Sequence, residues 1–234
     1  MREMGKKVAV GLYLEQMKWV LWYLPIIYVF YFILVRFVNE PEIRSISILT
    51  FTFQTATIFM LVCGILSSFV FFSQYVKYGV TRISYFQGLF LSVIFLAITI
   101  NGISLILAWV ISLFNLNLFK DVTLSSFGEN SWALTMFTYT IIVMIYYLTG
   151  WLVSIAFYRF GGFGGLISVV VAFVIIVLND LLWEFSTPKP FIGFLQFNKV
   201  VSQVTIALAG SIIIAAILTI LVYKIIKETP IKVT

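Results

Sequence analysis

Long apolar runs, separated by a few charged residues, make up nearly the whole chain. A helix needs about 20 mostly apolar residues to cross a hydrocarbon core about 30 Å thick. The runs predict six membrane-spanning helices, at residues 19–35, 46–72, 86–114, 132–158, 164–182 and 200–223. We therefore expect an all-α, multi-pass protein with one transmembrane domain. Residues 1–18 form a short interfacial helix, residues 19–223 the membrane domain and residues 224–234 a cytoplasmic tail.

The composition supports this class of protein. Of 234 residues, 62% are hydrophobic and 10% are charged, against about 45–50% apolar and about 25% charged in soluble domains. The single cysteine, Cys63, lies in an apolar run without a partner for a disulfide in the chain, and histidine is absent. Because the commonest general base and the usual metal ligands are missing, we expect neither a catalytic site nor a metal or cofactor in this chain.

The distribution of charges predicts the orientation, because cytoplasmic loops of membrane proteins carry an excess of Lys and Arg. With the N-terminus inside the cell, ten of the fifteen Lys and Arg residues fall in inner segments. Six of the nine acidic residues then fall in outer segments. We expect both ends of the chain in the cytoplasm, and we attribute the net charge of +6 to topology rather than to nucleic-acid binding.

A glycine-rich stretch, residues 161–165, follows the fourth predicted span. A phosphate-binding loop needs a strand before it and a Lys followed by Ser or Thr at its end, and the sequence predicts neither here. We interpret the stretch as a tight cytoplasmic turn between two spans.

Two acids, Asp180 and Glu184, would share a helical face at the outer end of the fifth span. Carboxylates inside a membrane bind cations or relay protons, whereas carboxylates at the boundary are solvated. Because Trp183 marks the boundary here, we favour a solvated helix end.

Two amides, Gln54 and Asn101, fall within predicted spans, where each needs a hydrogen-bonding partner. They either line a substrate path or join neighbouring helices, and we favour the second role. The last predicted span also carries small residues at four-residue spacing, which allow another helix to approach closely. These small residues are Ala207, Ser211, Ala215 and Thr219.

The inner loop after the second span mixes polar and aromatic residues, with Gly79 as a helix stop and Thr81 placed to cap the next helix. It is either a short basic loop or a small amphipathic element presented to a cytoplasmic partner. The residues of this candidate docking turn are Gln74, Tyr75, Lys77, Tyr78, Gly79, Val80, Thr81 and Arg82.

The outer segment before the last span is rich in aromatic residues and interrupted by prolines, which end helices. A solvated loop rarely holds so many aromatic rings. We expect short, broken, re-entrant helices at the membrane edge, with interfacial anchoring of the rings as the alternative. The residues that suggest this segment are Trp183, Phe185, Pro188, Pro190 and Phe191.

Three of these features together resemble the membrane subunits of ABC-2-type ABC transporters. They are the interfacial N-terminal segment, the turn Lys77-Tyr78-Gly79-Val80-Thr81-Arg82 and the re-entrant-looking stretch before the last span. The resemblance covers the whole chain in topology, and its specific motif is a few residues long. In size, charge and abundance of Phe and Ile, the chain is similar to the exporters of antimicrobial or cytolytic peptides in Gram-positive bacteria, such as the phenol-soluble-modulin exporters.

The resemblance implies a permease subunit in the bacterial cytoplasmic membrane, surrounded by membrane lipid. It would pair with a second permease subunit, the same or a sister chain, and recruit cytoplasmic ATPase subunits that carry ATP and Mg²⁺. The cargo implied is amphipathic or hydrophobic, a peptide or a lipid-like molecule. Two alternatives stand beside it: the substrate-capture subunit of a vitamin importer, and a non-transporting immunity or assembly protein.

Overall fold

The computed structural model describes residues 2–38, 48–113, 132–183 and 204–229. Within these ranges the chain is all-helical and contains no strand, as the sequence predicts. Five helices are long and apolar enough to cross a membrane, so the chain is a multi-pass membrane protein. The elements are α1 (Arg2–Phe37), α3 (Ile48–Leu66), the π-helix η1 (Ser67–Phe72), α4 (Ser73–Lys77), α5 (Arg82–Leu113), α6 (Trp132–Trp183) and α7 (Val204–Glu228).

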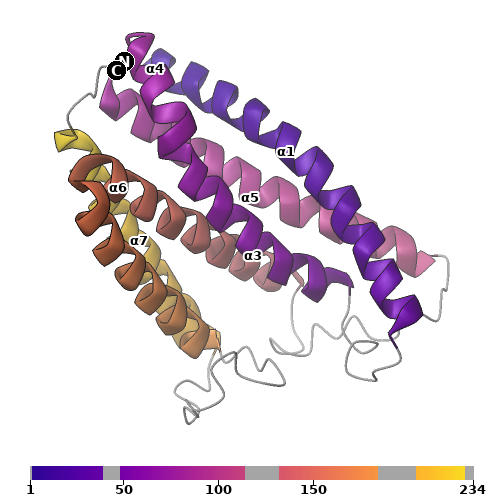
Figure 1. The fold of residues 1–234 in the computed structure, drawn as a ribbon. Helices are drawn as coiled ribbons and strands as arrows, with labels where there is room; N and C mark the ends of the chain where they lie inside the picture. Colours follow the sequence, from indigo (N-terminus) through magenta and orange to yellow (C-terminus); the bar gives the residue numbers. More distant parts are fainter. Residues whose placement is uncertain (1, 39–47, 114–131, 184–203, 230–234) are drawn as a thin grey trace.

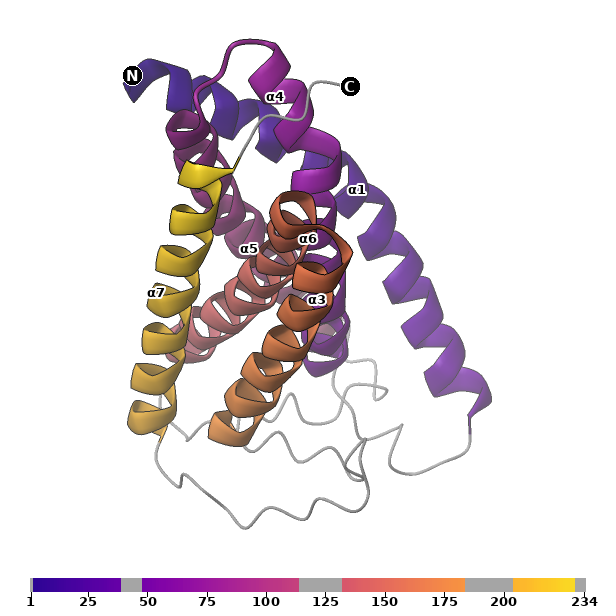
Figure 2. The ribbon, with the colours of Figure 1, turned by 60° about the vertical axis from the view of Figure 1, so that its left-hand side comes forward.

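The helices form one bundle, in which α1 packs mainly on α5 while α3 and α7 pack mainly on α6. Figures 1 and 2 show α4, the first turns of α1, the bend of α6 and the C-terminal end of α7 at the same end of the bundle. We call this the α4 end.

The first helix is longer than the sequence analysis predicts. α1 runs without a break from Arg2 to Phe37 and includes Pro25, so no helix boundary separates the expected interfacial segment from the first span. At 1.5 Å per residue its 36 residues measure about 54 Å, more than a hydrocarbon core about 30 Å thick. The first turns pack on α5, where Val8 occupies the space beside Gly88. Placement of residues 1–18 at the interface stays a prediction.

The glycine-rich stretch is a turn, as predicted. Gly161 adopts φ 72° and ψ −161° inside α6, a left-handed backbone conformation that glycine adopts without strain. At this residue the helix folds back on itself (Figure 2), giving a first limb, residues 132–160, and a second limb, residues 162–183. The limbs are close together at the turn, because a Cβ on Gly165 would lie 2.1 Å from the Phe157 ring.

α3 and the first limb of α6 cross with their backbones in contact. A Cβ on Gly64 would lie 2.1 Å from the carbonyl oxygen of Tyr147, and a Cβ on Gly150 would lie 2.2 Å from that of Leu61. The two glycines thus remove the side chains that would otherwise separate the helices, as small residues do in membrane bundles. The Ser154 hydroxyl adds a 3.3 Å hydrogen bond to the Gly64 carbonyl across the same crossing.

The outer surface of the bundle is apolar, with large exposed side chains along α1 and the second limb of α6, such as Trp22, Ile26, Leu166 and Val170. Many hydroxyls inside the bundle are satisfied within their own helix. The side chains of Thr52, Ser104 and Thr149, for example, donate to the carbonyl four residues before them. This pattern suits lipid as the surrounding solvent, since lipid offers no hydrogen bonds.

Candidate functional site

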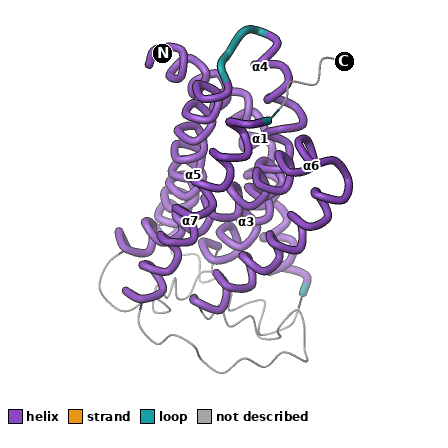
Figure 3. The backbone as a smooth tube through the Cα atoms, turned by 90° about the vertical axis from the view of Figure 1, so that its left-hand side faces the viewer, coloured by secondary structure: helices purple, strands orange, loops and turns teal. Residues whose placement is uncertain are grey.

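The candidate docking turn is a helix stop followed directly by a helix start (Figure 3). α4 ends at Lys77, and Gly79 follows with φ 81°. The amide of Val80 donates to the Tyr75 carbonyl at 3.0 Å, and the amide of Gly79 donates to the Val76 carbonyl at 3.0 Å. This pair of bonds is a Schellman motif, which satisfies the last carbonyls of a helix. The predicted glycine stop is confirmed.

Thr81 caps α5, as predicted. Its hydroxyl oxygen accepts the backbone N–H of Ser84 at 3.2 Å and lies 2.9 Å from the Ser84 hydroxyl. The carbonyl of Thr81 accepts the first helical bond, from the Tyr85 amide. Four residues separate α4 from α5, and both helix ends that face the turn are capped by hydrogen bonds.

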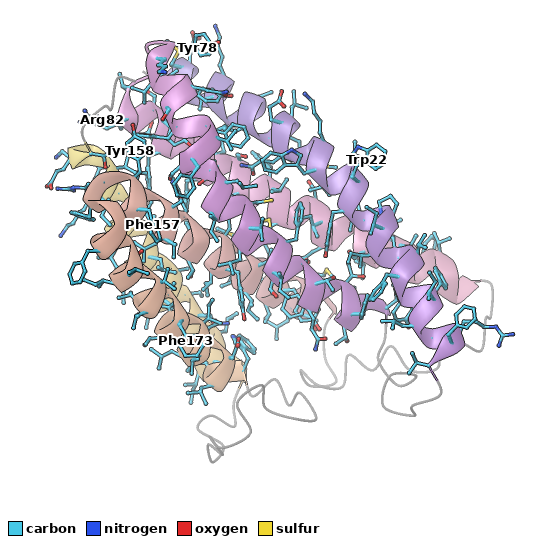
Figure 4. The ribbon with its side chains drawn as sticks, in the orientation of Figure 1. Trp22, Tyr78, Arg82, Phe157, Tyr158 and Phe173 are labelled. Carbon is cyan, nitrogen blue, oxygen red and sulfur yellow. The ribbon has the colours of Figure 1, made fainter. Side chains whose placement is uncertain are left out.

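The turn exposes some of its residues and buries others in part. Gln74, Lys77, Tyr78, Gly79 and Thr81 are exposed. The ring of Tyr78 is 86% exposed and lies at the tip of the turn, away from the bundle (Figure 4). Tyr75, Val80 and Arg82 are half-buried and contact the bundle. The predicted docking residues therefore divide into an outward set and an inward set.

Tyr75 connects the turn to α1 and α5. Its hydroxyl oxygen lies 2.8 Å from the position that a Cβ on Gly11 would occupy. Its ring packs against the Tyr85 ring at a centroid distance of 5.9 Å. Tyr75 therefore places α4 in contact with both α1 and α5.

A cluster of aromatic rings lies under the turn and joins four helices. Phe72 meets the rings of Tyr85 and Tyr158 edge-on, at 5.3 and 5.4 Å. Phe86 stacks on Trp151 at 5.4 Å and meets Tyr223 edge-on at 5.2 Å. These rings come from η1, α5, α6 and α7, so the cluster joins those four elements.

The helix leading into the turn is a π-helix from Ser67 to Phe72. π-helical segments are rare in proteins, and those that occur are often found at functional sites. Side chains support this one: the Tyr85 hydroxyl donates to the Ser67 carbonyl at 2.7 Å, and the Ser67 hydroxyl donates to the Gly64 carbonyl at 2.6 Å. The π-helix thus lies between the tight α3–α6 crossing and the exposed turn. An apolar run gives no signal for it.

Two arginines bind the C-terminal end of α7 at the α4 end of the bundle. Arg82, at the start of α5, donates to the Lys227 carbonyl at 3.2 Å. Arg159, on the first limb of α6, donates to the Ile225 carbonyl at 3.3 Å and pairs with Glu228 at 2.8 Å. Helix C-termini carry unpaired carbonyls and partial negative charge, both of which favour cations. The sequence places Arg82 in the candidate docking turn and Arg159 among the inner cations, after the end of the fourth predicted span; contact with α7 is not predicted for either residue.

The two amides in predicted spans have different environments. Asn101 is buried in α5 and donates to the Thr140 hydroxyl of α6 at 3.3 Å, which is the helix-joining role that we favour. Gln54 is exposed on α3. The two amides therefore differ in burial: Asn101 is buried and Gln54 is exposed.

The acid in the second limb of α6 differs from the expected solvated helix end. Asp180 is partly buried, and the Tyr146 hydroxyl of the first limb donates to its two carboxylate oxygens at 3.0 and 3.3 Å. Glu184 lies outside the described residues. The pairing of Asp180 with Glu184 therefore stays a prediction. Asp180 itself joins the two limbs of α6 through Tyr146.

Trp183 is the last residue of α6 and lies at the opposite end of the bundle from the docking turn (Figure 2). It is 8% exposed, and its indole N–H donates to the Ser211 hydroxyl of α7 at 2.6 Å. Ser211 and Ala207 are buried, so the ridge of small residues on the last helix does face a neighbouring helix. Phe185, Pro188, Pro190 and Phe191 lie outside the described residues, and the re-entrant segment stays a prediction.

Comparison with known proteins gave no relatives: no protein-family model, no curated protein and no solved structure matches the chain.

Proposed function

We propose that the chain is the permease subunit of an ATP-driven exporter of the ABC-2 type, in the bacterial cytoplasmic membrane. The observation that carries this proposal is the docking turn. It is capped at both sides, exposes Tyr78 and Lys77, and contacts the bundle through Tyr75, Val80 and Arg82. A turn of this kind is what a soluble ATPase needs in order to move membrane helices.

The proposed topology has six crossings with both ends in the cytoplasm. The two limbs of α6 each hold more than 20 residues, so counting them separately gives six helices that meet the length requirement. Among the described residues, Lys77, Arg82, Arg159, Lys224 and Lys227 gather at the α4 end. An excess of cations favours the cytoplasmic side, which is where an ATPase would meet the turn.

In the proposed mechanism, ATP-driven closure of two ATPase subunits pushes on the exposed face of the turn. The aromatic cluster and Arg82 pass this displacement to α5, α6 and α7. The motion opens a path between this chain and a second permease subunit, a copy or a sister chain. ATP and Mg²⁺ are bound by the ATPase subunits.

The proposed cargo is an amphipathic or hydrophobic molecule, a peptide or a lipid-like compound. Apolar walls bind such molecules through the area they bury, and the chain supplies 24 Phe residues. Within this class we favour the peptides that Gram-positive exporters carry, on the basis of the sequence resemblance.

The test is reconstitution of the whole chain with a candidate partner ATPase, such as one encoded beside its gene. We expect the ATPase to copurify with the chain, its hydrolysis rate to depend on the chain, and vesicles containing both to move an amphipathic peptide when ATP is added. A chain that binds a vitamin tightly without any ATPase would instead be a capture subunit. A complex that forms but moves no cargo would indicate an assembly or immunity protein.

A further inference from the structure

An apolar groove of about 520 Å³ runs between the two limbs of α6 and α7. Leu152 and Ala156 of the first limb form one wall, Ile167 and Val171 of the second limb another, and Leu221 and Ile225 of α7 the third. This volume is within the range of about 300–1,000 Å³ that small-molecule sites occupy. The groove is thus large enough for a ligand and is formed by three helical segments.

The walls of the groove offer a ligand almost nothing but hydrocarbon. Its polar side chain, Ser168, is already satisfied, since its hydroxyl donates to the Gly165 carbonyl at 2.6 Å. Ile167, Val171 and Leu221 are 52%, 40% and 39% exposed, so their apolar surfaces remain open to an occupant. An occupant that fills the groove must therefore be a hydrocarbon over this length.

One end of the groove is positively charged. Ile225, which lines it, accepts a hydrogen bond from Arg159, and the Arg159 guanidinium lies 4.8 Å from the ring centroid of Phe160, another lining residue. Lys224 is exposed one residue before Ile225. Of the described residues of α6 and α7, Glu228 is the acid at this end, and Arg159 pairs with it, which leaves the charge of Lys224 in excess.

We propose that this groove binds one acyl chain of an anionic phospholipid, with the phosphate at Lys224. Basic positions at the end of an apolar crevice between membrane helices recognise anionic head groups, and each buried CH₂ of the acyl chain adds to the binding. An apolar groove with a cationic end fits a molecule that is apolar along its length and negatively charged at one end. This inference needs only the membrane location and goes beyond the proposed function.

The experiment is native mass spectrometry of the whole chain released from nanodiscs of mixed phosphatidylglycerol and phosphatidylcholine. The wild-type chain should retain one phosphatidylglycerol more often than one phosphatidylcholine, by a factor of several. Ile167→Trp fills the groove and should abolish this retention. Leu166→Trp is its matched control, because Leu166 is 63% exposed on the neighbouring position and does not line the groove; it should retain lipid as the wild type does.

The charge requirement is tested in the same measurement. Lys224→Gln should remove the preference for phosphatidylglycerol while some lipid remains, and Lys227→Gln, at an exposed position on a different face of α7, should leave the preference unchanged. Equal retention of the two lipids by the wild type would overturn the proposal, as would full retention by Ile167→Trp. An Ile167→Cys variant that forms disulfide-linked dimers and loses the bound lipid would show that a second copy of the chain occupies the groove. This result would also overturn the proposal. None of these readouts involves the ATPase, so the lipid site can fail while the transport proposal stands.

Discussion

Arg82 and Lys227 are 145 positions apart in the sequence, and the Arg82 Nη1 donates to the Lys227 carbonyl oxygen at 3.2 Å. The bond joins the first residue of the helix after the docking turn to the last turn of α7. It offers a direct route by which displacement of the turn reaches the C-terminal end of the chain.

Removing this bond should loosen the end of α7 without unfolding the bundle. For Arg82→Ala we expect amide hydrogen exchange in the last turn of α7 to rise several-fold, because a hydrogen bond from a charged donor at the surface contributes on the order of 1 kcal/mol. Hydrogen-exchange mass spectrometry checks this. Lys227→Ala is the control, since it removes a charge at the same place but keeps the carbonyl; exchange that rises equally in both variants would contradict the proposed link.

Gly64→Ala should destabilise the protein strongly. The new Cβ would lie 2.1 Å from the Tyr147 carbonyl oxygen, and backbone atoms cannot move aside as a flexible side chain can. We expect a loss of more than about 2 kcal/mol in the free energy of unfolding, measured by denaturant titration in mild detergent. Gly102→Ala is the matched control in another helix, because no heavy atom lies within 4 Å of its Cβ position. This variant should raise the free energy of unfolding by up to about 1 kcal/mol.

Thr81→Ala should weaken the start of α5 by about 1 kcal/mol, the usual contribution of an N-cap side chain. The lost interaction is the bond from the Ser84 amide to the Thr81 hydroxyl. A lower midpoint of thermal unfolding would report it. Thr81→Ser keeps the hydroxyl and should restore the midpoint; a Ser variant as unstable as the Ala variant would show that the methyl group, and not the cap, matters.

Tyr78→Ala should separate docking from stability. Because the ring is 86% exposed, we expect the free energy of unfolding to stay within about 0.5 kcal/mol of the wild type. If the ring is an anchor for the ATPase, its loss should weaken the complex more than tenfold, as truncation of an interface hot spot does. Pull-down at graded ATPase concentrations measures this. Trp22→Ala removes a ring that is 77% exposed on α1 and should leave ATPase binding intact.

Asn101 and Thr140 allow the two roles of the buried amide to be separated. If the 3.3 Å bond between them joins α5 to α6, a double-mutant cycle of Asn101→Leu and Thr140→Val should give a coupling energy of about 0.6 kcal/mol, the average for such bonds in a membrane protein. Unfolding titrations supply the four values. Zero coupling together with altered cargo transport would assign Asn101 to the substrate path instead.

The sequence predicts the parts of this fold that depend on composition and on local backbone chemistry. Sparse charges reveal the apolar helices, Gly79 and Thr81 reveal the turn, and the run at 161–165 reveals the reversal inside α6. Each of these signals acts within a few residues of the structure it specifies. The same locality limits how well helix ends are predicted: Glu15 and Lys18 interrupt the apolar residues, yet α1 runs through both.

Contacts between distant segments could not be read from one sequence. Gly64 and Gly150 each stand within an apolar run, and nothing local pairs them. Arg159 shows the same limit, because its partners on α7 are more than 60 residues away. The sequence predicts Asp180 in solvent, but its environment depends on Tyr146, which the reversal at Gly161 brings to it.

The crossing at Gly64 and Gly150 also restricts how the bundle can deform. Where two main chains meet with no side chains between them, neither helix can rotate against the other without a collision of carbonyl groups. α3 and the first limb of α6 therefore behave as one rigid pair of helices. In the proposed transport cycle, the rearrangement must then occur around this pair of helices, with α1, α5 and α7 shifting relative to it.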